Sequence, residues 1–451
     1  MISSKRKVAA CAVLSFAICT AAHAATLAPL ASFGGGDGWL APGDRSYLTI
    51  DNTQRGMAYN PTTGNLLVVN RSGGLSIHIL DGATGDDLGT LDQGSGIITG
   101  GFFLGNMIGV GDDGAIYMGN LSLDTTTSTF KIYRWENESA TPTVAYSSAV
   151  DEPLAGARIG DTLDIIGSGT GTRLVAGYGS APAVAGNNSF ALFDTTDGLN
   201  FTATHVDVAT SPPIAGDFRL GITFRDDDTV LGRQTAHRLA RIVDVTGSMG
   251  TLTAEYATEG AGLNPMDFAT VQDKPLLALA NINDSRLFVY DITEPFEMVD
   301  PNPNIAVATT TTLHTSNPNG TGQVKFGAIS GDTAVLYALN TNNGIQAFEL
   351  TLDAVPPENN GDYNGNGVVD AADYVIWRAT EGQSVDPGTG ADGSGDGVVG
   401  PEDYDHWVAR FGDVISGGGA GNVAAPEPST FALLTLVLAW WCLAATRRRG
   451  V

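Results

Sequence analysis

The sequence predicts an all-β domain built as a propeller-like ring of six or seven blades, followed by a small α-helical module and a C-terminal apolar helix. Short runs rich in β-branched and aromatic residues alternate with Gly, Asn and Asp turns over most of the chain. The 451 residues include 58 glycines, and only 16% of residues are charged. That composition suits many short strands joined by tight turns.

An internal repeat supports the ring. An apolar run ending in an acid recurs at intervals of 47 to 58 residues, a period typical of four-stranded propeller blades. Each run follows a strand, a turn and a second strand, and turns such as Asp113-Gly114 are strong hairpin signals. A β-sandwich or a parallel β-helix is the alternative. The six runs are Ile77–Asp81, Ile132–Glu136, Phe190–Asp194, Arg241–Asp244, Leu287–Asp291 and Ile345–Glu349.

The predicted ring domain covers residues 25–355. We expect a strand around Leu30–Phe33 to complete the last blade. Segments such as Asp81–Gly85 and Phe130–Asn137 resemble an uncharacterised propeller-like family of exported bacterial surface proteins. That resemblance implies a fold and a location but carries no catalytic residues.

The first 24 residues are typical of a secretory signal peptide. Lys5, Arg6 and Lys7 precede an apolar run, which is followed by the small-x-small pattern that ends at Ala24. We therefore expect cleavage between Ala24 and Ala25. The run is too short to span about 30 Å of hydrocarbon as an anchor.

The opposite end has three parts in a fixed order. After a Gly-rich linker over residues 415–425, the tripeptide Pro426, Glu427, Pro428 precedes an apolar segment over residues 431–446 and an arginine cluster. Residues 426–451 resemble the PEP-CTERM sorting signal, which implies a short transmembrane helix and processing by an exosortase. An ordinary anchor helix is the alternative. We expect an exported protein at the cell surface, associated with the outer membrane, or extracellular.

All three cysteines lie in these two end segments, at Cys11, Cys19 and Cys442. A chain that loses both segments has no cysteine, so neither a disulfide nor a thiol nucleophile is expected in it.

Residues 356–414 carry a duplicated loop pattern. Oxygen-bearing side chains fall at loop positions 1, 3, 5 and 12 of both copies, with Gly at position 6 and a carbonyl at position 7, which suits Ca²⁺. Each loop precedes a Tyr and a Trp three residues apart, which share one face of a helix. The candidate ligands are Asp362, Asn364, Asn366, Val368, Asp370 and Asp373 in the first loop, and Asp392, Ser394, Asp396, Val398 and Asp403 in the second.

This pattern resembles a type I dockerin, a module with two EF-hand-like calcium loops. The resemblance implies Ca²⁺ as the cofactor and a cohesin-like domain as a partner. Two departures stand out. Gly400 removes the side-chain ligand at position 9 of the second loop, and positions 10 and 11, where dockerins often carry hydroxyls, are Ala371-Ala372 and Pro401-Glu402.

The net charge and the motifs of the chain exclude several classes of function. The chain has 49 acidic and 23 basic residues, a net charge of −26, which argues against binding nucleic acid. The string Gly109–Gly114 matches a dinucleotide-binding pattern, but the strand expected after it makes it a hairpin turn. No catalytic residue is predicted, although a glycosidase-type carboxylate pair stays open.

Two functions therefore remain. The first is a non-enzymatic exported surface or matrix protein whose propeller is a binding module. The second is a polysaccharide-degrading enzyme, an O-glycosyl hydrolase, or a carbohydrate-binding component attached through dockerin–cohesin pairing. A funnel lined by two close carboxylates and by aromatic side chains favours the enzyme.

Overall fold

The computed structural model describes residues 25–149, 153–180, 190–208, 218–233, 239–257, 262–293, 297–298, 315–352, 361–385 and 388–414. The predicted signal peptide, linker and sorting tail, with all three cysteines, lie outside these ranges. Within them, no helix is long and apolar enough to cross a membrane. The chain divides into two compact units, one covering Ala22–Asp353 and the other containing the segment from Ala354 onwards.

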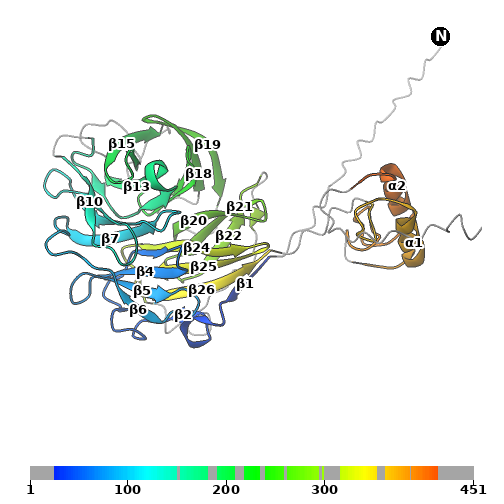
Figure 1. Cartoon of the computed structure of the whole chain (residues 1–451), viewed down its shortest axis with the longest axis horizontal. Helices are drawn as coiled ribbons and strands as arrows, with labels where there is room; N and C mark the ends of the chain where they lie inside the picture. Colours follow the sequence, from blue (N-terminus) through cyan, green and yellow to red (C-terminus); the bar gives the residue numbers. More distant parts are fainter. Residues whose placement is uncertain are drawn as a thin grey trace, which may run out of the picture. The chain divides into compact units, whose positions relative to one another are not determined.

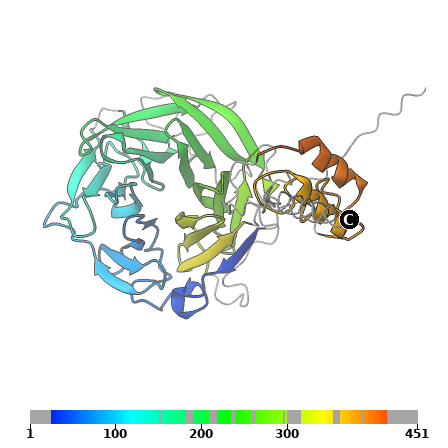
Figure 2. The ribbon, with the colours of Figure 1, turned by 45° about the vertical axis from the view of Figure 1, so that its right-hand side comes forward.

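The first unit is all-β, with four small blade-like sheets and one nine-stranded sheet in a propeller-like ring (Figures 1 and 2). Three small sheets each run through four consecutive antiparallel strands. Their strands are β3–β6 (Met57–Tyr59, Asn65–Asn70, Ser76–Asp81, Asp87–Thr90), β7–β10 (Phe103–Val110, Ile116–Leu121, Lys131–Trp135, Thr143–Ser147) and β20–β23 (Leu263–Val271, Lys274–Asn281, Leu287–Asp291, Glu297–Met298).

The fourth small sheet joins the two ends of the unit. Its strands β24–β26 (Gly322–Ser330, Thr333–Asn340, Ile345–Thr351) are extended by β1 (Thr26–Pro29), which pairs with β26. Strand β2 (Trp39–Leu40) also pairs with β26. An N-terminal strand completes the last sheet, as expected, but the predicted span was wrong: Phe33 begins the 3₁₀ turn Phe33–Gly35 instead.

The nine-stranded sheet consists of two antiparallel sets joined by a short parallel pairing of β15 with β19. The first set is β11–β15 (Arg158–Ile159, Asp164–Ile166, Arg173–Ser180, Phe190–Thr195, Phe201–Val208), with a 3₁₀ turn at Gly169–Gly171. The second set is β16–β19 (Gly221–Asp226, Thr229–Arg233, Leu239–Thr246, Met249–Ala257).

The strands at the inner edge form a closed circuit. Strands β3, β7, β12, β16, β20 and β24 each contact the next, and β24 contacts β3. The six repeated runs of the sequence coincide with β5, β9, β14, β18, β22 and β26, each the third strand counted outward from this circuit. The repeat was therefore predicted correctly. The circuit and the antiparallel pairing within each set contradict both a β-sandwich and a parallel β-helix.

Apolar side chains fill the spaces between neighbouring sets of strands. One cluster packs Leu67 and Ile79 of β4 and β5 against Ile108 and Trp135 of β7 and β9. Equivalent clusters lie at each of the other junctions around the circuit. The inner strands approach so closely that a Cβ at Gly221 would lie 2.2 Å from the carbonyl oxygen of Asn264. The core is thus spread around the ring between sheets.

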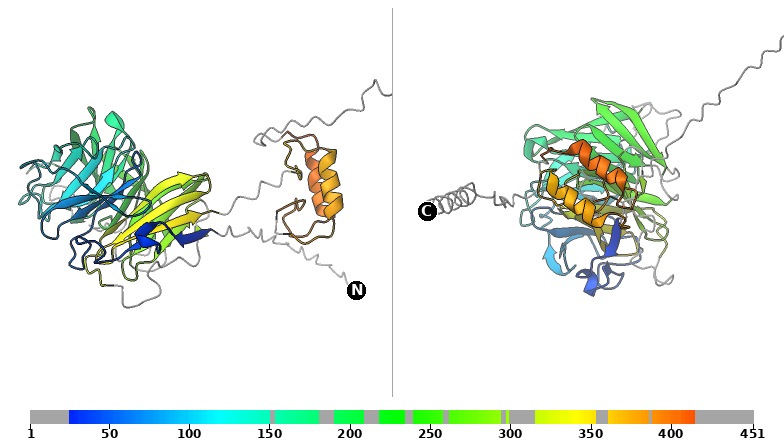
Figure 3. Two further views of the ribbon diagram at one scale, coloured as in Figure 1. Left: turned by 60° about the horizontal axis from the view of Figure 1, so that its bottom comes forward. Right: turned by 90° about the vertical axis from the view of Figure 1, so that its right-hand side faces the viewer.

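The described part of the second unit contains two helices, α1 (Ala371–Thr380) and α2 (Pro401–Arg410). They contact each other and lie side by side in both views of Figure 3. Each helix directly follows one of the predicted loops, so the sequence placed both correctly.

Candidate functional site

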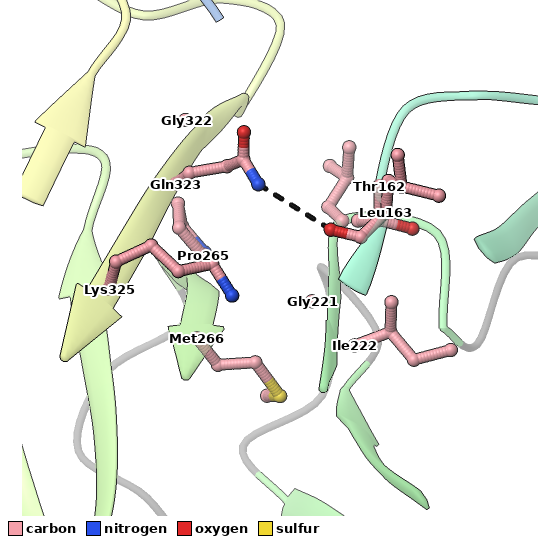
Figure 4. A pocket seen from close by; sticks show the side chains of 10 residues that line it. Thr162, Leu163, Gly221, Ile222, Pro265, Met266, Gly322, Gln323 and Lys325 are labelled. Carbon is pink, nitrogen blue, oxygen red and sulfur yellow. Dashed lines mark hydrogen bonds between the residues drawn. The ribbon is translucent and has the colours of Figure 1, made fainter. Parts of the chain in front are cut away.

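The axial space of the ring is crossed by one buried amide. Gln323 of β24 accepts the N–H of Met57 in β3 at 2.7 Å and donates to the carbonyl oxygens of Ile108 in β7 (3.0 Å) and Leu163 beside β12 (3.4 Å). Figure 4 shows Gln323 reaching from its strand to Leu163. One side chain therefore links four inner strands and divides the space along the axis.

A charged cluster lies two residues further along β24. The ammonium Nζ of Lys325 is 2.6 Å from Oδ1 of Asp164 in β12 and 2.7 Å from Oδ1 of Asp267 in β20. All three side chains are buried, with at most 14% of their surface exposed. Backbone groups complete the cluster: the N–H of Phe224 donates to Asp164 at 2.9 Å, and that of Phe326 donates to Asp267 at 2.7 Å.

The cluster has unusual proton affinities. Burial raises the pKa of Asp267 to about 6, opposed by the positive charge of Lys325 and reinforced by the negative charge of Asp164. Burial lowers the pKa of Lys325, but the two carboxylates outweigh it and raise the pKa above its ordinary value. Lys325 therefore stays protonated, and its charge compensates one of the two carboxylates at neutral pH.

These groups lie at the base of a cavity of about 240 Å³. Tyr59, Phe224, Phe268 and Phe326 contribute to its walls, and Asp112, whose pKa is raised by burial, lies at its lining. The cavity thus combines aromatic rings with a net negative charge. On the other side of Gln323, the space drawn in Figure 4 is much narrower, with room for about one water-sized sphere.

The sequence analysis missed this cluster, although a signal was present. Asp164, Asp267 and Lys325 each stand between two apolar residues in what the sequence marks as an inner strand, as in Met266-Asp267-Phe268. A charge at such a position is buried and must be paired. What the sequence does not supply is the pairing, because the three residues come from three different repeats.

The first predicted calcium loop folds around its own carboxylates. Asp362 accepts the backbone N–H groups of Asn366 (3.1 Å) and Gly367 (2.7 Å). Asp373 accepts those of Asn364 (2.9 Å) and Asp370 (2.7 Å). Positions 1 and 12 therefore both bind the backbone between them, which draws the loop into a closed ring of oxygen-bearing groups.

The second loop repeats this pattern position by position. Asp392 accepts the N–H groups of Asp396 (3.2 Å) and Gly397 (2.8 Å), and Asp403 accepts those of Ser394 (2.7 Å) and Gly400 (2.5 Å). Of the loop carboxylates, Asp373, Asp392 and Asp403 are fully buried, Asp362 and Asp370 are partly buried, and Asp396 is exposed. Burial, reinforced by the charges of Asp362 and Asp370, raises the pKa of Asp373.

The two loop–helix units exchange a pair of hydrogen bonds. The indole N–H of Trp377 in α1 donates to the carbonyl oxygen of Gly400 at 2.8 Å, and that of Trp407 in α2 donates to Asp370 at 3.0 Å. Gly400 and Asp370 occupy the same loop position, so the exchange has approximate two-fold symmetry. Tyr374 and Tyr404 pack against the indoles with ring centroids 5.0 to 5.6 Å apart, and their own ring centroids are 6.0 Å apart. The predicted aromatic helix faces are confirmed.

The donor set of the loops suits a hard cation in composition, with carboxylate, amide, hydroxyl and carbonyl oxygens. Within the described ranges, however, no three His, Cys, Asp or Glu side chains are gathered as a metal-binding group. The position-1 and position-12 carboxylates bind the backbone instead. The remaining ligand candidates are Asp370, Asp396, Asn364, Asn366, Ser394 and the carbonyls of Val368 and Val398, of which only Asp370 and Asp396 are acidic.

The other sequence motifs have structural roles in the described chain. Residues Gly111–Gly114 form the turn between β7 and β8, where the N–H of Gly111 donates to the carbonyl of Ala115 at 2.8 Å. The expected hairpin is therefore confirmed, and no helix follows it to bind a dinucleotide.

Comparison with known proteins supports the fold alone. No family model matches the chain, and no curated protein matches it. Among solved structures, a DUF4623 family protein from Bacteroides eggerthii is 19% identical, with a TM-score of 0.51 over 68% of this chain and 72% of that one. The chain is thus similar to that protein in its propeller-like ring.

Two other structures show weaker likeness. The allergen Mala s 1 from Malassezia sympodialis is 12% identical, with a TM-score of 0.38 over 65% of this chain and 91% of that one. A gluconolactonase from Xanthomonas campestris is 13% identical, with a TM-score of 0.41 over 74% and 92%.

Proposed function

We propose that this chain is an exported, non-enzymatic binding protein, with a propeller-like binding module, a calcium-binding dockerin-like module and a tail processed by an exosortase. The observation that carries the non-enzymatic assignment is the pairing of Asp164 and Asp267 with Lys325. An acid and a base in glycoside hydrolysis must exchange protons with substrate and water. Here both carboxylates are already engaged by one ammonium and by backbone N–H groups.

We further propose that the ring counts six blades. In this assignment, β1 and β24–β26 form one blade, and the nine-stranded sheet contains two. The closed circuit of inner strands and the apolar cluster at each junction support this count. The parallel pairing of β15 with β19 then joins the outer edges of two neighbouring blades.

Calcium binding is the second part of the proposal. Asp362, Asn364, Asn366, Asp370 and Asp373, with the Val368 carbonyl, would hold one ion. Asp392, Ser394, Asp396 and Asp403, with the Val398 carbonyl, would hold another, more weakly because Gly400 offers no side chain. The ions would stabilise the loops by relieving repulsion between carboxylates.

Titration calorimetry of the mature chain with CaCl₂ tests this part. We expect two binding events in the wild type and loss of the tighter one in Asp362→Ala with Asp373→Ala. Asp405→Ala, which removes an exposed carboxylate of α2 outside the loops, serves as the matched control. Absence of heat and of any circular-dichroism change on adding Ca²⁺ to the wild type would contradict the assignment.

Export and processing have their own test. We expect mass spectrometry of the protein from its native host to find an N-terminus at Ala25 and a C-terminus near Pro426–Pro428. A chain recovered intact in the cytoplasm contradicts export, and one recovered outside with its arginine cluster contradicts exosortase processing.

One observation favours the alternative function. Asp164 and Asp267 contact the same ammonium, so they lie as close as the carboxyl pair of a retaining glycosidase, about 5 Å, and aromatic side chains line the same cavity. Release of reducing sugar from polysaccharides by the wild type, abolished in Asp267→Asn, would establish the enzyme. No release above that of Asp267→Asn supports the binding module.

A further inference from the structure

Four arginines gather where the inner strands begin, at the end of the axial space away from the Lys325 cavity. Arg55 directly precedes Gly56 and β3, Arg71 follows β4, Arg158 opens β11, and Arg219 precedes β16. They come from three different repeats. In a chain with 49 acidic and 23 basic residues, such a concentration of guanidinium groups is unexpected.

One carboxylate holds two of these arginines. Oδ2 of Asp161 is 2.8 Å from Nε of both Arg158 and Arg219, and the Asp161 side chain is only 1% exposed. Burial raises the pKa of Asp161, but the bonds and charges of the two arginines outweigh it and lower the pKa below its ordinary value. Asp161 is therefore ionised and neutralises one of the two guanidinium groups.

The other two arginines lie against one aromatic ring. The guanidinium carbon Cζ of Arg71 is 4.1 Å from the ring centroid of Phe103, and that of Arg55 is 5.1 Å from it. Among the described residues, Arg71 donates only to uncharged oxygens, those of Asn106 (3.0 Å) and of the Asn52 carbonyl (2.8 Å). Two like charges therefore share one ring, and no carboxylate in the described part of the chain bonds either of them.

A hydrogen-bond chain connects the two pairs. Asn106, which accepts from Arg71, donates through its side-chain amide to the carbonyl of Gly160 at 2.7 Å, directly before Asp161. The backbone of Gly56, next to Arg55, lies against the same Asn106, because a Cβ at Gly56 would be 2.4 Å from its carbonyl oxygen. The four guanidinium groups thus belong to one cluster, which we call the arginine cluster.

Arg55 is the exception among buried charges. It is only 6% exposed, yet among the described residues no hydrogen bond or ion pair engages its guanidinium, and its Nε is fully buried without a partner. Burial lowers the pKa of Arg55, opposed by Asp161 and reinforced by Arg158 and Arg219. Leaving a buried charge unpaired is costly unless a ligand supplies the missing acceptor.

The charges of the cluster do not balance. Arg158 and Arg219 bond the carboxylate of Asp161, whose charge also acts on Arg55. Asp51, which bonds Thr49 and Thr53, acts on Arg71 from a distance. Even with both acids counted, two positive charges remain in excess. The contact with Phe103 occupies one side of the guanidinium groups of Arg55 and Arg71. Arg71 directs its N–H groups to Asn106 and Asn52, so among the described residues the N–H groups of Arg55 are the ones left for an oxyanion, which a guanidinium edge binds in bidentate fashion.

We propose that the arginine cluster is a binding site for an oxyanion, the carboxylate or phosphate-type group of a ligand that the ring takes up at this end. The proposal rests on the proposed function only in treating the ring as a binding module. What it adds is the class of ligand, an oxyanion. The calcium and processing tests are independent of it, so their failure and the failure of this site are distinguishable.

The test is titration calorimetry of the mature full chain with three probes: inorganic phosphate, galacturonate and uncharged galactose. We expect phosphate or galacturonate to bind, and galactose to bind at least tenfold more weakly. We also expect 0.5 M NaCl to lower the affinity for the anion. The stronger of the two anions identifies the source of the oxyanion. Absence of binding by both anions overturns the proposal.

The variant Arg55→Gln removes the unpaired charge and keeps most of the side-chain volume. We expect affinity for the anion to fall by about tenfold to a hundredfold, the weight of one or two charge-assisted hydrogen bonds. Arg173→Gln is the matched control, because it also removes one guanidinium charge. The guanidinium of Arg173 lies 2.6 Å from the carboxylate of Asp194, and Arg173 pairs with Ile166 at the far end of β12, away from the arginine cluster. Equal affinities in the two variants overturn the site.

A second readout separates binding from folding. Because Arg55 is buried without a partner, Arg55→Gln should leave the melting temperature of the ligand-free protein unchanged or higher. Anion should raise the melting temperature of the wild type but not of this variant. A variant that melts lower without ligand and responds to anion like the wild type shows that Arg55 serves the fold only, which overturns the proposal.

Discussion

At the residue scale, the charge of Lys325 holds the inner strands together as well as lining the cavity. It contacts carboxylates from β12 and β20 while standing on β24 itself. Removing one partner from a buried ion pair leaves the others uncompensated. One ammonium group therefore links three inner strands, in addition to the strands that Gln323 links.

We expect Lys325→Met to lower the free energy of unfolding by about 3 to 5 kcal/mol, because it leaves two buried carboxylates unpaired. Urea unfolding at pH 7 measures this loss. Lys131→Met, at a lysine whose ammonium bonds only Thr99 in an exposed setting, should change stability by less than about 0.5 kcal/mol. Equal effects of the two substitutions would contradict the structural role of the cluster.

Asp267 should give the ring domain a particular pH dependence. Its pKa is raised from 3.8 to about 6 by folding. Between these values the folded state binds more protons than the unfolded state, so this residue contributes stability at low pH that is lost as pH rises towards 6. We expect Asp267→Asn to lose stability more slowly than the wild type between pH 4.5 and 7 in urea titrations. Identical slopes would show that Asp267 does not titrate in this range.

The sequence predicts the duplicated loops but not the two charged clusters of the ring. The duplicated loops could be predicted from spacing alone, because all their candidate ligands lie within one short segment, and calcium binding by them stays a prediction. The Lys325 cluster and the arginine cluster each combine side chains from separate repeats, so spacing along the chain says nothing about their contact. Only the closing of the ring brings Asp164 within 2.6 Å of Lys325.

At the scale of the element, the inner strands require glycine where one backbone passes another. Gly221 begins β16 and faces the carbonyl oxygen of Asn264 in β20, which a Cβ would approach to 2.2 Å. Its φ is not positive, so the requirement is for space rather than for backbone freedom. Glycine at this position lets two neighbouring sets of strands approach each other closely.

We expect Gly221→Ala to destabilise the ring domain by about 1 to 3 kcal/mol, because the two strands must separate to admit the methyl group. Gly171→Ala is the control, since a Cβ there meets nothing within 4 Å and the φ is not positive. Thermal unfolding followed by circular dichroism distinguishes them. A melting temperature as low for Gly171→Ala as for Gly221→Ala would contradict this reading.

At the scale of the whole molecule, the ring is closed by its two ends. Strand β1 pairs residue by residue with β26, from Thr26 against Thr351 to Pro29 against Phe348. The sequence predicted an N-terminal closing strand around Leu30–Phe33, but the strand lies at Thr26–Pro29. Phe33 instead begins a 3₁₀ turn that includes Gly34 and Gly35.

Deleting residues 25–30 should therefore open the ring. We expect the deletion variant to lose cooperativity in thermal unfolding and to aggregate, because the part of β26 from Phe348 to Thr351 becomes an unpaired edge. Replacing Thr26 by Val keeps the strand and its backbone pairing and should behave like the wild type. A deletion variant with an unchanged melting temperature would show that β1 contributes nothing to closure.

The pairing of β1 with β26 also fixes the order of events during synthesis. Because the first strand pairs with a strand made only when the ring sequence is nearly complete, the final sheet cannot be completed before Ile345–Thr351 has been made. The pairing between the two ends of the ring thus comes after the synthesis of every strand between them.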